Sequence, residues 1–396
     1  MVNTTYDVVA YEQYDCEREI YDGNVIYESF LRAKKNSDWK ASVQRFEMTY
    51  LLQLADIQKR LKNGSYEFTK GKEFVLRERG KERPITGEII RDRIVKHAIC
   101  DEVLTPTLRP YLIYDNGASL KGKGIDFTRR RLETHLHKYY RHHGSNDGYI
   151  LLMDYSKYYD NIRHDKLIEL YEKYIDDELV LHYIQKIVDS AKVDVSYMSD
   201  EEYKNCMDVL FNSLEYRQTI NQSMLTGDRY MYKHLNVGDQ TAQDAGILYP
   251  TPIDNYIKIV KGEKYYARYM DDSYVIHESK EHLIELLKDI TEYAKQYGIA
   301  INLHKTQICK LSELWRFLQI QYSLTDTGRV IHKINPKRLV TMRRKMKKLA
   351  PKMQPNDFKI FFNSWFCAHK RYISKRQKQN MINLYNQLSK EVYKNV

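Results

Sequence analysis

The chain has few cysteines and no long apolar run. Its five cysteines stand far apart, with no CxxC pair and no cluster at metal-ligand spacing: Cys16, Cys100, Cys206, Cys309 and Cys367. A structural zinc of the usual kinds is excluded, and isolated thiols fit a reducing compartment, so we expect a cytoplasmic protein. No stretch approaches a run of about 18 apolar residues, which crossing a membrane takes. The N-terminus also lacks the order of a signal peptide, so we expect no membrane partner.

The sequence also lacks internal repeats, low-complexity runs and linkers rich in proline or glycine. With 42% hydrophobic and 30% charged residues, its 396 residues fit one continuous, multi-lobed globular domain. Positive charge is in excess, because 64 Lys and Arg stand against 53 Asp and Glu and leave a formal net charge of +11. This excess favours a polyanionic partner such as nucleic acid.

Two tetrapeptides have the form Tyr-X-Asp-Asp: YIDD at 174–177 and YMDD at 269–272. The acids of YIDD precede apolar residues at helical spacing, so we expect Asp176 and Asp177 to cap the N-terminus of a helix. The acids of YMDD interrupt two segments that alternate apolar and polar residues, which predicts a β-hairpin with Asp271 and Asp272 at its turn. Paired carboxylates in such a turn need a compensating cation.

A third acid is predicted to join the YMDD pair. The run GYILLMDYS at 148–156 is a short apolar strand that ends in Asp154. Antiparallel pairing of this strand with the YMDD hairpin would place Asp154 beside Asp271 and Asp272. Three carboxylates can hold two Mg²⁺ ions, with Mn²⁺ as an alternative, about 3.5–4 Å apart. One ion would activate a 3′-hydroxyl and the other would stabilise a leaving pyrophosphate, which is nucleotidyl transfer.

The remaining pattern predicts mostly helices. We expect helices over residues 38–61, 89–104 (stopped by Thr105 and Pro106), 164–191 and 280–297 (closed by Gly298), a basic β-hairpin around Gly71 and Gly80, and a helix broken near Pro250 and Pro252. Residues 192–233 show no clear period, and we interpret them as an insertion. From Pro336 onward we expect three helices, of which the first, PKRLVTMRRKMKKLA, is strongly basic.

In this order, the motifs resemble those of bacterial reverse transcriptases, from about residue 65 to the C-terminus. The resemblance implies a non-LTR, group II intron-like lineage, nearest to the enzymes of diversity-generating retroelements and phage defence. It also implies an α+β right-hand polymerase fold with fingers, palm and thumb. We expect N-terminal helices and fingers over 1–147, a palm over 148–330 with the insertion at about 192–233, and a helical thumb over 331–396.

The resemblance also assigns catalytic roles. MDYSKYYDNIRHDKL is similar to the first palm motif, which makes Asp154 a metal ligand and Tyr159 the aromatic residue that blocks a ribonucleotide 2′-hydroxyl. YMDD matches the polymerase signature, so Asp271 and Asp272 become the other metal ligands. INLHKT resembles the family's LxxNxxKT, which makes Lys305 the acid that protonates pyrophosphate. The alternative for Lys305 is an ordinary surface lysine after a strand.

Basic residues are expected to bind nucleotide and nucleic acid. GKERPI resembles the fingers motif that grips the triphosphate, which implies that role for Lys81 and Arg83; a solvated hairpin charge is the alternative for Arg83. RDRIVKHA and the GKG at 122–124 are similar to motifs that hold template and primer. The alternative for the basic helix is an ordinary solvated face. We expect these motifs and this helix to contact nucleic acid through Arg91, Arg93, Lys121, Lys123, Arg338, Arg343 and Arg344.

The sequence departs from the family pattern at two motifs. The loop VGDQTAQ resembles a GxxxSQ form, with Ala242 replacing serine, and implies nucleotide contacts from Val237 and Gln243. Many reverse transcriptases place a glutamine where Val237 stands, and valine cannot donate that hydrogen bond, so we expect reduced nucleotide discrimination. In WRFLQIQY, which occupies the primer-grip place, Gln319 replaces the usual glycine and leaves the geometry of that turn open.

Three functions follow from these patterns. The first is an RNA-directed DNA polymerase that makes cDNA from dNTPs on a template RNA encoded at its own locus, in anti-phage defence or a diversity-generating element. The second is template-independent or protein-primed DNA synthesis. The third is a non-catalytic RNA-binding scaffold, which the intact acids disfavour. The sequence identifies neither the template RNA nor the primer, and a second copy of the chain or an accessory protein stays open as a partner.

Overall fold

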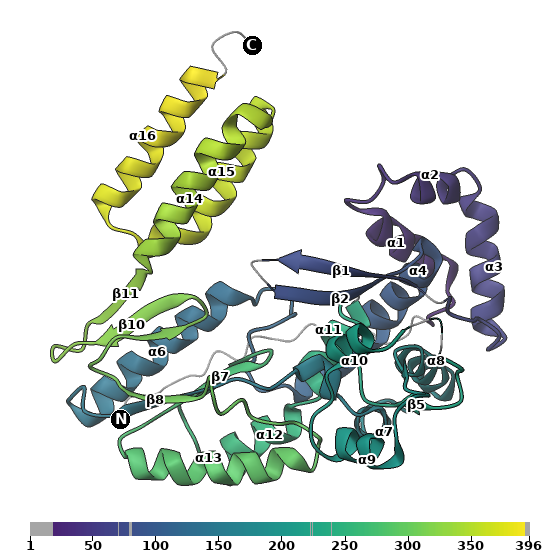
Figure 1. Ribbon diagram of the computed structural model, residues 1–396, viewed down its shortest axis with the longest axis horizontal. Coiled ribbons are helices and arrows are strands. Elements are labelled where there is room, and N and C mark those ends of the chain that lie inside the picture. The colour runs from purple at the N-terminus through teal and green to yellow at the C-terminus, as the bar shows by residue number, and fades with distance from the viewer. Residues whose placement is uncertain are drawn as a thin grey trace, which may run out of the picture.

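A four-stranded antiparallel sheet lies at the centre of the computed structural model, which describes residues 19–392 except 70, 79, 80, 222, 224 and 239. Cys16 therefore lies outside the described residues. The strand order is β6 (Tyr266–Tyr269), β7 (Asp272–His277), β3 (Tyr149–Met153) and β8 (Gln307–Lys310). Successive side chains point to opposite faces, and both faces of β3 and β7 are buried, so this sheet is the middle layer of the molecule (Figure 1).

Helices cover the two faces of this sheet. Apolar residues of α7 (His164–Glu172) and α13 (Lys280–Lys295) join one core with Leu151 and Val275. Residues of α6 (Ile125–His143) join a second core with Ile150 and Tyr274. The expected C-terminal cap after α13 is confirmed, because Gly298 has φ 66° and its N–H donates to the carbonyl of Lys295.

A second sheet, of order β11-β10-β9, packs on α6. Its strands are β9 (Trp315–Phe317), β10 (Ile320–Leu324) and β11 (Val330–Ile334). The β9–β10 turn holds Leu318 at φ 42° and Gln319 at φ 74°, which is the left-handed region that favours glycine. The carbonyl of Leu318 accepts a 2.7 Å hydrogen bond from the buried Arg129. The chain thus keeps a tight two-residue turn although Gln319 replaces glycine.

The N-terminal part is built from α1 (Gly23–Lys34), α2 (Ala41–Glu47) and α3 (Tyr50–Lys62). The expectation of one helix over 38–61 was wrong, because Thr49 leaves the helical region at φ −128° and separates α2 from α3. Buried apolar residues keep helical spacing across this break, so periodicity cannot locate it. The expected basic hairpin is confirmed as β1 (Lys72–Glu78) and β2 (Lys81–Gly87).

Two other helices differ from their predicted bounds. The helix from residue 89 is α4 (Ile90–Ile99), and it continues through a π-helical turn, Cys100–Leu104, into α5 (Thr105–Leu108). Pro106 does not stop it, because it lies just after the π-helical turn, where the backbone hydrogen bonds change from one register to another and a missing N–H is tolerated. The predicted helix over 164–191 is likewise divided into α7 and α8 (Glu178–Asp189). Asp177 is the N-cap of α8 and accepts from the N–H groups of Leu179 and Val180.

The insertion, residues 192–233, forms a small unit with its own core. It contains β4 (Val193–Asp194), α9 (Asp200–Asp208), α10 (Ser213–Thr219) and β5 (Tyr230–Met231). Val195, Phe211 and Met231 are buried together in it. The chain then enters α11 (Gln240–Leu248) and α12 (Thr251–Asn255), which continues as the π-helical turn Tyr256–Val260. The predicted break near Pro250 is confirmed.

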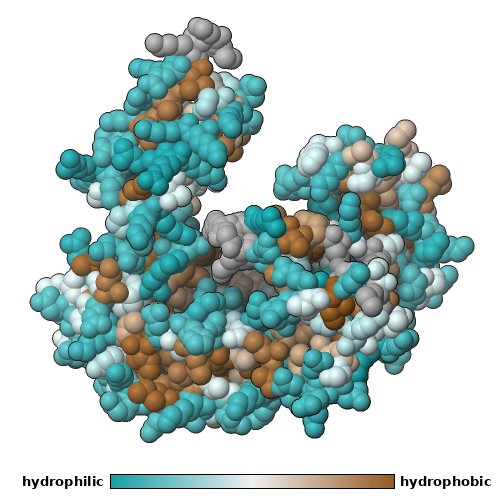
Figure 2. Space-filling view, in the orientation of Figure 1, coloured by the Kyte–Doolittle hydropathy of each residue, from teal (hydrophilic) through white to brown (hydrophobic). Residues whose placement is uncertain are grey.

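The C-terminal part is a three-helix bundle, as predicted: α14 (Pro336–Leu349), α15 (Pro355–His369) and α16 (Lys375–Val392). Its helices enclose a separate core that includes Met346, Phe358 and Leu384. Short 3₁₀ turns occur at Arg109–Tyr111, Tyr158–Asn161, Ala350–Lys352 and Lys370–Tyr372. A wide hollow separates this bundle from the N-terminal helices (Figure 2). Among the described helices, none has the length and apolarity that crossing a membrane requires.

Candidate active site

The three acids predicted from the sequence come from two neighbouring strands. The predicted antiparallel pairing is confirmed, because Met153 of β3 pairs with Ser273 of β7. Asp154 directly follows β3 and therefore lies at the edge of the sheet where β7 begins with Asp272. Tyr269 pairs with Asp272 and closes the β6–β7 hairpin, which leaves Met270 and Asp271 at the turn.

A buried ion pair holds this turn. Met270 has φ 55°, unusual for a residue with a side chain, and its carbonyl accepts from the Arg268 guanidinium at 3.2 Å. Arg268 is fully buried and also donates to both carboxylate oxygens of Asp254 on α12. Burial acts to lower the pKa of Arg268, but Asp254 more than offsets this and raises it. The sequence analysis missed both residues, although an arginine at a buried strand position was a usable signal.

Asp154 and Asp271 adjoin each other. Burial, and then the negative charge of Asp154, raise the pKa of Asp271 above its ordinary value. Asp154 is itself buried and accepts hydrogen bonds from the Lys305 ammonium and, at 3.3 Å, from the side-chain amide of Asn302. Lys305 therefore lies at the acids and supplies part of their compensating charge.

Within the described ranges, no three acidic, histidine or cysteine side chains are arranged to hold a metal ion. The three predicted metal ligands, Asp154, Asp271 and Asp272, therefore do not form a ready metal site in this structure, in which Lys305 is bonded to Asp154. The chemistry of the donors nevertheless fits a divalent cation. Two adjoining carboxylates, one with a raised pKa, are stabilised by positive charge, and carboxylate oxygens are the ligands that Mg²⁺ and Mn²⁺ prefer.

Tyr159 lies between the acid turn and α11. Its hydroxyl is 3.9 Å from the sulfur of Met270. On its other side it packs on Gly246, where an added Cβ would lie 2.7 Å from the hydroxyl oxygen. Tyr158 donates to the Gly246 carbonyl at 2.8 Å. A glycine at 246 therefore permits the position of Tyr159, and the sequence analysis did not single it out.

A basic cavity of about 790 Å³ adjoins α11 and the N-terminal helices. Its lining includes Arg93, Lys121 and Gln243 from the predicted binding residues, together with Lys35 and Lys40. Gln243 accepts a 3.4 Å hydrogen bond from the Ser119 hydroxyl. The structure thus brings residues of the N-terminal part and of α11, which are far apart in sequence, to one cavity that is large enough for a nucleotide.

Other predicted binding residues lie elsewhere. Arg91 is engaged by Gln53 and Asp56 of α3. Lys123 donates to the Tyr114 carbonyl at 2.7 Å, and burial lowers its pKa to about 8. In this structure both side chains therefore bind other groups of the protein.

The last predicted residues lie on β2, on α14 and before α11. Lys81 and Arg83 lie on β2, opposite Glu78 and Leu76, and their side chains are outside the described set. Arg343 and Arg344 are exposed on α14, where Arg338 also lies. Val237 is half-buried in the loop before α11.

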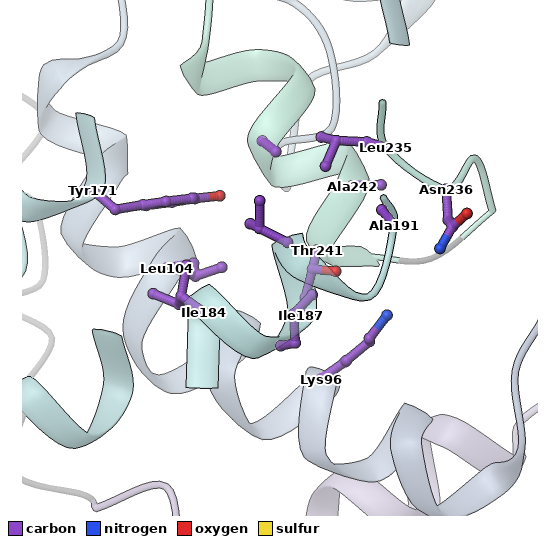
Figure 3. Close-up of a pocket in the computed structure, with 12 residues that line it drawn as sticks. Lys96, Leu104, Tyr171, Ile184, Ile187, Ala191, Leu235, Asn236, Thr241 and Ala242 are labelled. Carbon is purple, nitrogen blue, oxygen red and sulfur yellow. The ribbon is translucent and has the colours of Figure 1, made fainter. Parts of the chain in front are cut away.

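A small cavity of about 20 Å³, enough for about one water molecule, lies at Ala242, the residue that replaces serine. Ala242 lies beside Leu235 and Ala191, with Ile187 on a further wall (Figure 3). A serine hydroxyl here would face mainly apolar side chains, so alanine suits the site.

An antiparallel sheet with acids at the end of β3 and in the adjacent hairpin, flanked by helices and a separate bundle, is the arrangement of a right-hand nucleic-acid polymerase. Residues 69–322, more than half of the chain, match the family model "Reverse transcriptase (RNA-dependent DNA polymerase)". The chain therefore belongs to the reverse transcriptase family, the RNA-directed DNA polymerases. The predicted family, fold class and enzyme class are confirmed, and the predicted bacterial lineage stays a prediction.

No curated protein sequence matches the chain. Among solved structures, it is similar to apo telomerase from Candida tropicalis, with a TM-score of 0.46 and 14% identity. The similarity covers 66% of this chain and 47% of that one, so the chain spans about half the length of that protein.

Proposed function

We propose that the chain copies a dedicated RNA, encoded at its own locus, into cDNA from dNTPs, in anti-phage defence or in a diversity-generating element. The observation that carries this proposal is the placement of Asp154 beside Asp271, with Lys305 on Asp154. In this proposal the fingers end near residue 147, the palm spans 148–330 and the thumb begins at 331. The described hollow between thumb and N-terminal helices then receives the template–product duplex (Figure 2).

The proposed catalytic residues are Asp154, Asp271, Asp272 and Lys305. Reverse transcriptase domains generally use divalent metal ions, and the three acids would hold two Mg²⁺ or Mn²⁺ that activate the primer hydroxyl and stabilise pyrophosphate. The Lys305 side chain is 56% exposed, so it can turn from Asp154 toward the leaving group and donate its proton there. Its position at the acids supports this role over that of an ordinary surface lysine.

The proposed contacts to the nucleotide and to nucleic acid come from different side chains. Tyr159, packed on Gly246, would exclude a ribose 2′-hydroxyl, while Lys81 and Arg83 would bind the triphosphate. Val237 and Gln243 would lie near the nucleotide. The basic residues of the large cavity and of α14 would bind phosphates without reading sequence: Arg93, Lys121, Arg338, Arg343 and Arg344.

The test is to express the chain with its native flanking sequences and to sequence all RNA and DNA that co-purify. The Asp271→Ala variant removes a proposed metal ligand. Asp176→Ala is a matched control, because it makes the same change at an exposed residue in the same position of the YIDD motif. We expect DNA complementary to one locus-encoded RNA from the wild type and the control, and none from Asp271→Ala.

Other results would point to the two alternative functions. Homopolymeric DNA joined covalently to the protein would indicate template-independent, protein-primed synthesis. A specific RNA with no DNA in any sample would indicate an RNA-binding scaffold and would contradict the proposal.

A further inference from the structure

The insertion, residues 192–233, packs against the turn that carries Tyr159. This 3₁₀ turn, Tyr158–Asn161, is short, and two of its residues make side-chain hydrogen bonds to the insertion and its flank. The insertion has a core of its own, so it can act as a rigid support.

Asp160 forms the first link. One of its carboxylate oxygens accepts from the Ser213 hydroxyl at 2.6 Å and from Nδ1 of His234 at 2.9 Å. Burial acts to raise the pKa of Asp160, but the His234 hydrogen bond and charge, then the Ser213 hydrogen bond and Lys157, lower it on balance. Asp160 is thus a half-buried, ionised acceptor whose partners lie in the insertion and directly after it.

Asn161 forms the second link. Its side-chain amide donates to the Phe211 carbonyl at 3.1 Å and to the Lys157 carbonyl at 2.9 Å. Its side-chain oxygen accepts from the Phe211 N–H at 2.9 Å. Phe211 belongs to the core of the insertion, so this two-way pairing ties the turn to that core. Both amide functions of Asn161, which is 1% exposed, are satisfied in this way.

The base of the insertion is held as well. The buried Lys233 ammonium donates to the carbonyls of Cys206, Met207 and Val209 at the end of α9. On the opposite side, the Gln218 amide donates to Glu82 of β2 at 3.1 Å. The insertion therefore contacts both the Tyr159 turn and the strand that carries Lys81 and Arg83.

The backbone of Tyr159 is held just beyond the insertion as well. Its carbonyl accepts from the Leu235 N–H at 2.9 Å, just beyond the insertion. The ring itself is confined between Gly246 and Met270, so a shift of the backbone moves the ring edge relative to the acid turn. A steric filter on a sugar hydroxyl depends on such small displacements.

We propose that the insertion is a positioning element for sugar selection. In this proposal Asp160, Asn161 and Ser213 hold the Tyr159 ring so close to the sugar of the incoming nucleotide that a dNTP fits and an rNTP does not. This inference rests on the proposed function, since it presumes that Tyr159 meets the sugar of the incoming nucleotide.

The test compares kcat and KM for dTTP and UTP in single-nucleotide incorporation, on poly(rA)/oligo(dT) and on the transcript of the chain's own locus. Ser213→Ala removes one hydrogen bond to Asp160 from the insertion side. Asn161→Asp removes the amide that donates to Phe211. Ser196→Ala is the matched control, because the hydrogen bonds that the Ser196 hydroxyl makes to described residues, Asp194 and Gly227, lie within the insertion.

We expect the ratio of kcat/KM for dTTP to that for UTP to fall about tenfold in Ser213→Ala and further in Asn161→Asp. The ratio should stay at the wild-type value in Ser196→Ala. A purely structural role would lower incorporation of both nucleotides in parallel and leave the ratio unchanged, and that result would overturn the inference.

Two further outcomes separate this inference from the proposed function. In the first outcome, the wild type incorporates dTTP in a reaction that requires Asp271, while Ser213→Ala leaves the ratio of kcat/KM for dTTP to that for UTP unchanged. This result overturns the inference and leaves the proposed function standing. No dNTP incorporation by the wild type on either template overturns both. Should Asn161→Asp fail to fold, as its melting curve would show, the milder Ser213→Ala decides the question.

Discussion

The two Tyr-X-Asp-Asp motifs have nearly the same letters and opposite environments. In YIDD, Asp176 is exposed and Asp177 caps α8 through backbone N–H groups. In YMDD, Asp271 is half-buried beside Asp154, on a turn held by Arg268 and Asp254. Carboxylates turned toward N–H donors are satisfied locally, whereas carboxylates turned toward each other need a cation. The neighbours of a motif, and not its letters, therefore determine its chemistry.

The largest difference between the motifs should appear in catalysis. We expect Asp271→Asn to lower DNA synthesis by about 10³-fold, because a metal-binding carboxylate supplies several kcal/mol of transition-state stabilisation. Asp176→Asn should retain wild-type synthesis. Primer extension with the purified variants measures both, and equal losses would remove the distinction between the two motifs.

The next largest effect concerns the ion pair that only YMDD has. Arg268→Ala leaves Asp254 buried without its cation, so we expect about 3–5 kcal/mol less unfolding free energy, measured by urea denaturation. The double variant Arg268→Met with Asp254→Leu should recover much of this loss, since it removes the second charge too. A double variant as unstable as the single one would contradict this explanation.

The raised pKa of Asp271 predicts a pH dependence of stability. The folded protein holds this proton more tightly than the unfolded chain, so stability is full below the ordinary carboxyl pKa of about 4 and falls as pH rises toward the raised value. We therefore expect Asp271→Asn to melt at a higher temperature than the wild type at neutral pH. This advantage should shrink toward about pH 4. Melting curves across this range, with Asp176→Asn as the control, measure it.

The smallest predicted effect is at the YIDD cap. Asp177→Ala should cost about 1 kcal/mol of unfolding free energy, because two N–H groups of α8 lose their acceptor. Asp177→Ser, which can still cap, should restore most of it. Urea denaturation compares the two, and polymerase activity should be unaffected by either. An activity loss in Asp177→Ala without a stability loss would assign this motif a catalytic role.

Much of the site could be predicted from the sequence, because its signals are local. An apolar strand that ends in Asp154 and a hairpin with acids at its turn are encoded by alternation over a few residues. Local patterns also gave two wrong helix bounds. The apolar spacing continues across Thr49 although the helix breaks there, and the helix continues past Pro106 although proline usually ends one. A period reports which face is buried and not whether the helix axis continues.

The sequence by itself determined the element types around the acids, the excess of positive charge and the family, since each depends on residues close together along the chain. Only the tertiary structure decided that Lys305 lies on Asp154, that Arg268 pairs with Asp254, and that the insertion supports the Tyr159 turn through Asp160 and Asn161. These partners meet only after the chain has closed on itself. No local period encodes which buried polar groups will satisfy one another across such separations.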